Sequence, residues 1–142
     1  MAYKVSKIED LEFYINDRID FNSLKRDEIS INVENSLNIY DNNASIITSI
    51  GYIKKNTREL ILKEKLKLIL EGEFHEYNLY SKSNKPQDKN KLIDLSVRLS
   101  IEINATIRGI LYIKTKDLPT ISQMYLPIID EPTLRMQLNE DI

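Results

Sequence analysis

The sequence has no cysteine, a single histidine and only three glycines among its 142 residues. Without cysteine the chain can form neither disulfide bonds nor thiolate metal sites, which is typical of proteins from reducing compartments. A single histidine, His75, excludes a metal site built from several histidines. Three scattered glycines cannot form a glycine-rich phosphate-binding loop. We therefore expect no bound metal and no cofactor.

Neither sign of charge dominates, because 20 Lys and Arg residues face 22 Asp and Glu residues and leave a net charge of −2. Such a chain lacks the basic character that nucleic-acid binding requires. Residues 1–13 also lack the continuous apolar run of a secretory signal or a membrane span. With 42% hydrophobic and 30% charged residues, we expect one globular domain over residues 1–142. It should be cytoplasmic, with no nucleic-acid partner and no membrane insertion.

Residues 59–75 are rich in Leu, Lys and Glu, which favour helices. Their order favours a strand instead, because nearly every second residue is apolar. The apolar parity comprises Leu60, Leu62, Glu64, Leu66, Leu68, Leu70, Gly72 and Phe74. A period of two is the pattern of a strand with one buried face. We predict a strand, with Lys63, Lys65 and Lys67 on its solvated face.

Three further segments have strand patterns. Residues 28–40 alternate in the same way, and a strand is also expected within residues 3–16. Residues 44–53 are rich in β-branched residues and apolar at both parities, which suits a central strand. Polar residues at 41–44 and 54–57 separate these runs as turns. The first half therefore predicts four antiparallel strands with one apolar and one solvated face.

From Lys91 the spacing of apolar residues changes to three and four, which predicts a long helix from Lys91 to Lys114. One apolar row consists of Leu92, Leu95, Leu99, Ile103, Ile107, Ile110 and Ile113. A second row consists of Ile93, Val97, Ile101 and Ala105. One sheet can cover only one side of such a helix. The second row therefore predicts an oligomer interface, unless the C-terminal segment covers it.

The segments on either side of this helix are irregular. Residues 80–90 are polar and contain Pro86, which predicts a loop. Three prolines interrupt the apolar segment after the helix: Pro119, Pro127 and Pro132. Asp130 can cap a short last helix over residues 131–139. The predicted fold is α+β: a four-stranded antiparallel sheet, a long helix, a proline-containing apolar cross-over loop and a short C-terminal helix.

The sequence contains no convincing catalytic group. Glu71 and Glu73 share a strand face, and paired carboxylates can act as acid and base. That face also carries several lysines, so a solvated charged surface is the better interpretation. The sequence offers His75 no second histidine, no cysteine and no obvious nucleophile as a partner. No Ser or Thr lies in a recognisable nucleophile motif. We expect a protein that is not an enzyme.

Three stretches resemble the SecB family of chaperones. LEGEF at residues 70–74 resembles the end of the fourth SecB strand, where Gly-x-Phe follows an alternating run. DLPTISQMYLPIID at residues 117–130 resembles the loop after the long SecB helix, although Ile129-Asp130 replaces the usual Asn-Phe step. EISINVENSLNIYD at residues 28–41 resembles the second SecB strand and its turn. With the order of elements, the resemblance extends from about residue 3 to about residue 138.

The resemblance implies a cytoplasmic, ATP-independent chaperone, a holdase that binds unfolded or pre-export polypeptides in apolar grooves. It also implies a homotetramer, a dimer of dimers with long helices between the sheets, which accounts for the second apolar row. The client-binding positions that match the family pattern are Phe74, Leu118, Pro119, Leu126, Pro127 and Ile129. The apolar character of the loop adds Ile121, Met124 and Tyr125.

The partner of such a chaperone depends on its branch of the family. Export SecB proteins dock on the SecA motor through an acidic patch, whereas the solvated face here mixes Lys63 and Lys67 with Glu71. Other SecB-like chaperones occur beside toxin–antitoxin pairs and protect an unstable antitoxin. Beyond unfolded clients, SecA or an antitoxin is therefore the expected partner. Two other classes remain open: a non-catalytic regulatory or ligand-binding protein with this fold, and a structural oligomerisation module.

Overall fold

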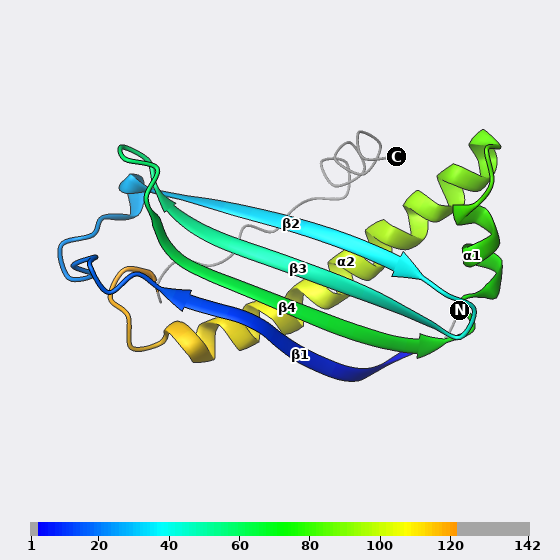
Figure 1. Ribbon diagram of the computed structural model, residues 1–142, viewed down its shortest axis with the longest axis horizontal. Helices are drawn as coiled ribbons and strands as arrows, with labels where there is room; N and C mark the ends of the chain where they lie inside the picture. Colours follow the sequence, from blue (N-terminus) through cyan, green and yellow to red (C-terminus); the bar gives the residue numbers. More distant parts are fainter. Residues whose placement is uncertain (1–2, 122–142) are drawn as a thin grey trace.

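The computed structural model describes residues 3–121, apart from the side chains of residues 102 and 103. Its strands are β1 (Tyr3–Ile15), β2 (Ile29–Ile39), β3 (Asn43–Lys54) and β4 (Leu60–Gly72) (Figure 1). Its helices are η1 (Arg26–Glu28), α1 (His75–Ser81) and α2 (Pro86–Thr115). The predicted α+β class, four-stranded sheet and long helix are confirmed. Beyond residue 121, the predicted cross-over loop and the helix at 131–139 lie outside the described residues.

The four strands form one antiparallel sheet in the order β1-β4-β3-β2. Short turns join β2 to β3 and β3 to β4. The connection of residues 16–28 instead links β1 to β2, which lie at opposite edges, and it runs at one end of the sheet (Figure 1). The last strand therefore lies between the first and the third and pairs with both.

The alternation of β4 separates its two faces as predicted. The residues that face α2 are at most 2% exposed: Leu62, Leu66, Leu68 and Leu70. Lys63, Lys65 and Lys67 lie on the opposite face and stay partly exposed. The strand is therefore confirmed against the helix propensity of its residues, because burial of one face outweighs these weak local preferences. The buried face also contains a charged residue, Glu64, at 0% exposure.

Two bulges interrupt β1, at Ser6 and Leu11, where one extra residue breaks the pairing with β4. Each extra residue changes which positions lie on the helix side: they are even-numbered after Ser6 and odd-numbered again after Leu11. Facing residues of an antiparallel pair lie on the same side of the sheet. Phe13 opposite Glu64, and Asp10 opposite a leucine of β4, therefore both lie on the helix side. Uninterrupted alternation would put Asp10 and Phe13 on opposite faces.

The long helix α2 begins at Pro86, five residues before the predicted start at Lys91. The prediction of a loop around Pro86 was wrong because proline fits the first turn of a helix, where its missing N–H would have no intrahelical partner. α2 crosses one face of the sheet diagonally (Figure 1). Its contribution to the core consists of Leu95, Leu99, Ile107 and Leu111.

The short helix α1 occupies residues that the sequence assigned to a strand end and a loop. His75, the last residue of the strand predicted over residues 59–75, is instead the first residue of α1. The backbone carbonyl of Asp41, in the turn after β2, accepts the N–H of Phe74 at 2.9 Å. The Asp41 carboxylate bonds Nδ2 of Asn78 and Nδ1 of His75, each at 2.9 Å, and these bonds, Asn78 first, lower the pKa of Asp41. This turn therefore redirects the chain from strand to helix.

We expect Leu68→Ala to lower the free energy of unfolding by about 2–5 kcal/mol, because Leu68 is fully buried in the core. Lys67→Ala, its neighbour on the opposite face, should change this free energy by about 0.5 kcal/mol or less. Urea unfolding at one fixed protein concentration measures both. Equal losses in the two variants would contradict the assignment of faces.

Candidate functional site

The predicted client-binding residues lie in two separate places. Phe74 is 0% exposed, and its ring centroid lies 6.4 Å from that of Tyr3. It follows the end of β4, whereas residues 118–121 lie at the opposite end of the sheet (Figure 1). The described residues therefore do not bring Phe74 next to the segment after α2. The other predicted positions lie outside the described residues: Met124, Tyr125, Leu126, Pro127 and Ile129.

The segment after α2 packs against the connection of residues 16–28. Thr120 Oγ1 donates to the backbone carbonyl of Leu24 at 2.6 Å. Ile121 is 1% exposed and belongs to the core, while Leu118 is half-buried and Pro119 is exposed. Of these predicted positions, Leu118 and Pro119 offer accessible surface in the single chain. Their role in client binding stays a prediction.

The predicted interface row on α2 divides into a buried and an exposed half. Ile93 and Val97 are 4% and 3% exposed in the single chain. Ile101 is 46% exposed, and Ala105 is exposed as well. The exposed half continues along the helix into a set that we call the outer stripe: Ile101, Ala105, Gly109, Tyr112 and Ile113. These positions recur at helical spacing and leave one apolar face of α2 uncovered.

The edge strand β1 adds apolar surface on the helix side of the sheet. Val5, Ile8, Phe13 and Ile15 are between 37% and 45% exposed, although each faces a residue of the buried side of β4. Their exposure follows from position, since an edge strand has a neighbour on one side only. Sequence alternation alone marks such residues as core, so it does not reveal this strip.

At the other edge, β2 presents backbone groups and apolar side chains together. Tyr40 N–H donates to the Asn43 carbonyl and Lys55 N–H to the Glu28 carbonyl, both at 2.8 Å, so even-numbered residues bond β3 at both ends. Because an antiparallel ladder alternates, odd-numbered residues of 31–39 point their N–H and C=O groups outward. Four of these carry half-buried apolar side chains on the helix side: Ile31, Val33, Leu37 and Ile39.

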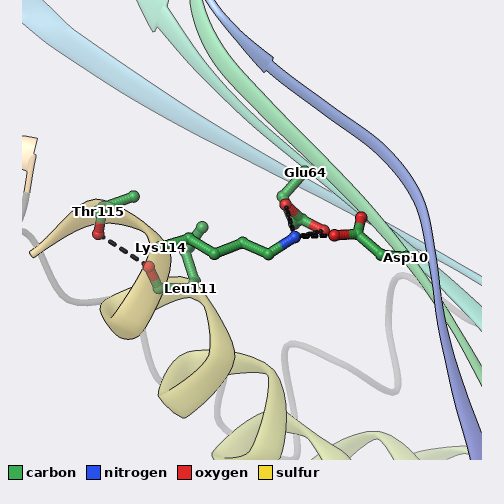
Figure 2. A network of polar contacts seen from close by, with 5 residues as sticks. All are labelled: Asp10, Glu64, Leu111, Lys114 and Thr115. Atoms are coloured by element: carbon green, nitrogen blue, oxygen red, sulfur yellow. Dashed lines mark hydrogen bonds and ion pairs between the residues drawn. The ribbon is translucent and has the colours of Figure 1, made fainter.

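An ion cluster joins the C-terminal end of α2 to the sheet (Figure 2). Lys114 Nζ lies 3.1 and 3.0 Å from the two carboxylate oxygens of Glu64, and it also bonds Asp10. The same ammonium lies 4.8 Å from the ring centroid of Phe13. Beside it, in the last turn of α2, Thr115 Oγ1 donates to the Leu111 carbonyl at 2.8 Å. Strands β1 and β4 and helix α2 thus meet at one charged point.

The cluster holds two carboxylates and one ammonium, and it shifts the pKa of each group. Burial, and then the hydrogen bond with Asp10, raise the pKa of Glu64 to about 7 against the pull of Lys114. The hydrogen bond from Lys114 lowers the pKa of Asp10. Burial acts to lower the pKa of Lys114, but the bonds to Asp10 and Glu64 outweigh it and raise that pKa. One ammonium cannot balance both the buried Glu64 carboxylate and the exposed Asp10 carboxylate, so Glu64 retains its proton to a pH well above its ordinary pKa.

Sequence reasoning did not identify this cluster. Its one local signal is Glu64, a carboxyl residue at the parity of a leucine face. A buried acid needs a partner, and the sequence does not name it, because Asp10 and Lys114 lie 54 and 50 residues away. The bulges of β1 also hide the fact that Asp10 faces the helix.

Within residues 3–121, no three His, Cys, Asp or Glu side chains form a group that could hold a metal ion. No helix in this range is long and apolar enough to cross a membrane. The exposed bond between His75 and Asp41 fixes α1 to the turn after β2.

Comparison with known proteins shows one chaperone to which the fold is similar. A scan against protein-family models and a search of curated proteins each gave no match. A search of solved structures matched the SecB-like chaperone Rv1957 of Mycobacterium tuberculosis, in complex with a ChAD peptide from the antitoxin HigA1 (Rv1956). The match covers 90% of this chain and 88% of that chain, with a TM-score of 0.53 and 11% sequence identity. At this identity the two chains share a fold, and the resemblance to SecB is confirmed at that level.

We expect the wild-type chain to lose stability relative to Glu64→Gln as the pH rises. The folded chain holds the Glu64 proton up to a pKa of about 7, whereas the unfolded chain loses it near 4.5. The folded state therefore binds more protons between these values, and its free energy of unfolding falls as the pH rises through them. From about pH 5 to about pH 8 the difference between the variants should change by about 2 kcal/mol in urea unfolding. Parallel profiles would contradict the raised pKa.

Proposed function

We propose that this chain is an ATP-independent chaperone of the SecB type, a holdase that binds unfolded or extended polypeptides. The observation that carries the proposal is the shared fold with a SecB-like chaperone over 90% of the chain. Because a fold alone admits many functions, the surface must supply the rest of the argument. Three accessible apolar regions support it: the edge of β2, the helix side of β1 and the outer stripe of α2.

The edge of β2 is the surface best suited to an extended client. An added strand can pair with the outward N–H and C=O groups of odd-numbered residues, and these bonds do not depend on the client's sequence. The adjacent side chains of Ile31, Val33 and Leu37 can cover alternate apolar side chains of the client. Burial of apolar area contributes about 25 cal/mol per Å² before ordering costs. Such a site favours unfolded segments over folded proteins.

We further propose that the chain forms a homo-oligomer, a tetramer of two dimers, through the outer stripe of α2. Gly109 lies in the middle of this stripe, and a Cβ built there has no atom within 4 Å. Ala105 lies one turn before it, so two helices can approach closely at this point. The exposed side chains of Ile101, Tyr112 and Ile113 then pack around the crossing. This retains the predicted interface for its exposed half and extends it toward Lys114.

The client that we favour is an apolar segment of an unstable antitoxin. The matched chaperone was solved with a peptide from an antitoxin, which supports a peptide or antitoxin client. The outer face of the sheet places Lys63, Lys65 and Lys67 along its central strand β4, so it does not offer the acidic patch expected for docking on SecA. We place the protein in the cytoplasm, where antitoxins act.

If an extended client pairs with the edge of β2, removal of one outward N–H of this strand should weaken client binding. Val33→Pro removes such a donor at a position where an edge strand tolerates proline. We expect about two- to tenfold weaker binding of a reduced, carboxymethylated, permanently unfolded protein, which corresponds to one hydrogen bond. Val33→Ala, which keeps the N–H, is the matched control. The readout is client affinity by fluorescence anisotropy, with circular dichroism to check the fold.

Three outcomes separate this proposal from its alternatives. A holdase binds several unrelated unfolded proteins and ignores their folded forms. A ligand-binding protein retains no unfolded client, and a structural module loses its accessible apolar surface on assembly. Equal affinities of Val33→Pro and Val33→Ala would remove β2 from the binding site.

The assembly predicts that a charge at Gly109 dissociates the oligomer. Gly109→Glu should raise helix propensity in a single chain, yet it should lower the mass measured by light scattering after size exclusion. Asn90→Glu introduces the same charge at an exposed position of α2 outside the stripe and should leave the mass unchanged. A monomeric wild-type chain, or equal masses for both variants, would rule out assembly through this stripe.

A further inference from the structure

The C-terminal end of α2 is held in place by two features that neither client binding nor assembly requires. One is the ion cluster of Asp10, Glu64 and Lys114 (Figure 2). The other is the backbone of Thr120, whose φ of 67° lies in the left-handed region. A β-branched residue rarely adopts this conformation. The segment of residues 116–121 therefore follows the ion cluster directly and has a strained residue near its far end.

The strain at Thr120 persists because its surroundings hold it. Its hydroxyl donates to the Leu24 carbonyl at 2.6 Å, and the next side chain, Ile121, is buried in the core. Strained residues of this kind relax when the contacts around them are lost. Any movement of the end of α2 pulls on this short segment. Docking of residues 116–121 thus depends on the position of Lys114.

The position of Lys114 depends in turn on the charge of the cluster. The charged groups that face Glu64 are Asp10 from β1 and Lys114 from α2, and its neighbour on β3 is Ile50. With one proton on the carboxyl pair, the two carboxyls share a hydrogen bond and the single ammonium balances the remaining negative charge. Without that proton, the buried carboxylate of Glu64 and the exposed carboxylate of Asp10 repel each other.

We propose that this cluster is a proton-operated latch. It holds residues 116–121 against the connection of residues 16–28 while it carries a proton, and it releases them when the proton is lost. The raised pKa of Glu64, about 7, places the change near neutral pH. If the proposed function is correct, release exposes apolar surface beside Leu118 and Pro119 and regulates client access. The latch itself does not rest on that function.

The absence of cysteine makes the latch directly measurable. Ile121→Cys places a thiol in the latched segment, and Ile46→Cys places one in the core of β3, where only global unfolding exposes it. Thiol labelling of the full chain, corrected for thiolate fraction, gives the opening constant at each position. From about pH 6 to about pH 8, we expect opening at position 121 to increase about tenfold. It should also exceed opening at position 46 at both pH values.

Two further variants and a second measurement test whether the opening depends on the proton of Glu64. Glu64→Gln keeps the cluster uncharged at this position, so the pH dependence at position 121 should disappear. Glu71→Gln, an exposed carboxylate that pairs with Lys4 on the outer face, should leave it intact. Amide exchange of Leu118, whose N–H donates to the Thr115 carbonyl at 2.9 Å, reports the same opening without a cysteine.

The latch is overturned if positions 46 and 121 open with equal constants, because the segment then opens only with the whole chain. It is also overturned if the pH dependence survives Glu64→Gln. Neither readout involves a client. Failure of the latch therefore leaves the holdase proposal standing, and failure of client binding leaves the latch standing.

Discussion

Burial of one face of β4 under α2 is the interaction on which the rest of the structure depends. β4 has a strand on each side, so its leucines form the centre of the core and fix the height of the helix above the sheet. The same contact brings Lys114 within reach of Glu64 and Asp10. A charged group is tolerated at this centre because three elements converge on it with complementary charges. Among the described residues, the most buried acid therefore lies where the C-terminal end of α2 meets the sheet.

The diagonal path of α2 also determines what stays uncovered. A single helix cannot shield four strands, and it protects β3 and β4 better than the two edges. Within residues 3–121, the edges consequently keep apolar side chains and backbone groups that pair with no further strand, which are a liability for a chain that has no use for them. Under the proposed function these regions have separate uses. One edge pairs with an extended client, and the outer stripe of α2 is covered by another copy of the chain.

Periodicity in the sequence predicted the strands and the long helix because burial of one face requires regularly spaced apolar residues. They recur at every second position in a strand and at every third or fourth position in a helix. β4 illustrates the strength of this signal, since its period overcame residues that favour helix. The start of α2 was misplaced because Pro86 breaks a helix interior but suits a helix start. α1 was missed because seven residues anchored by Asp41 carry too short a pattern. Of the candidate site, the sequence indicated the apolar segment after α2, whereas the ion cluster depends on contacts 50 or more residues apart.

The two bulges of β1 carry a lesson about how this chain can change over generations. Ser6 and Leu11 each add one residue, and the second restores the alternation that the first displaces. Each bulge absorbs one inserted residue, so the side chains on either side of it keep the faces that a regular strand would give them. Deletion of Ser6 or Leu11 would leave Asp10 and Phe13 on the helix side, whereas straightening of both bulges with the two residues retained would turn Asp10 away from the helix. Relatives that share the ion cluster should therefore keep the number of residues between these bulges even where the residues themselves differ.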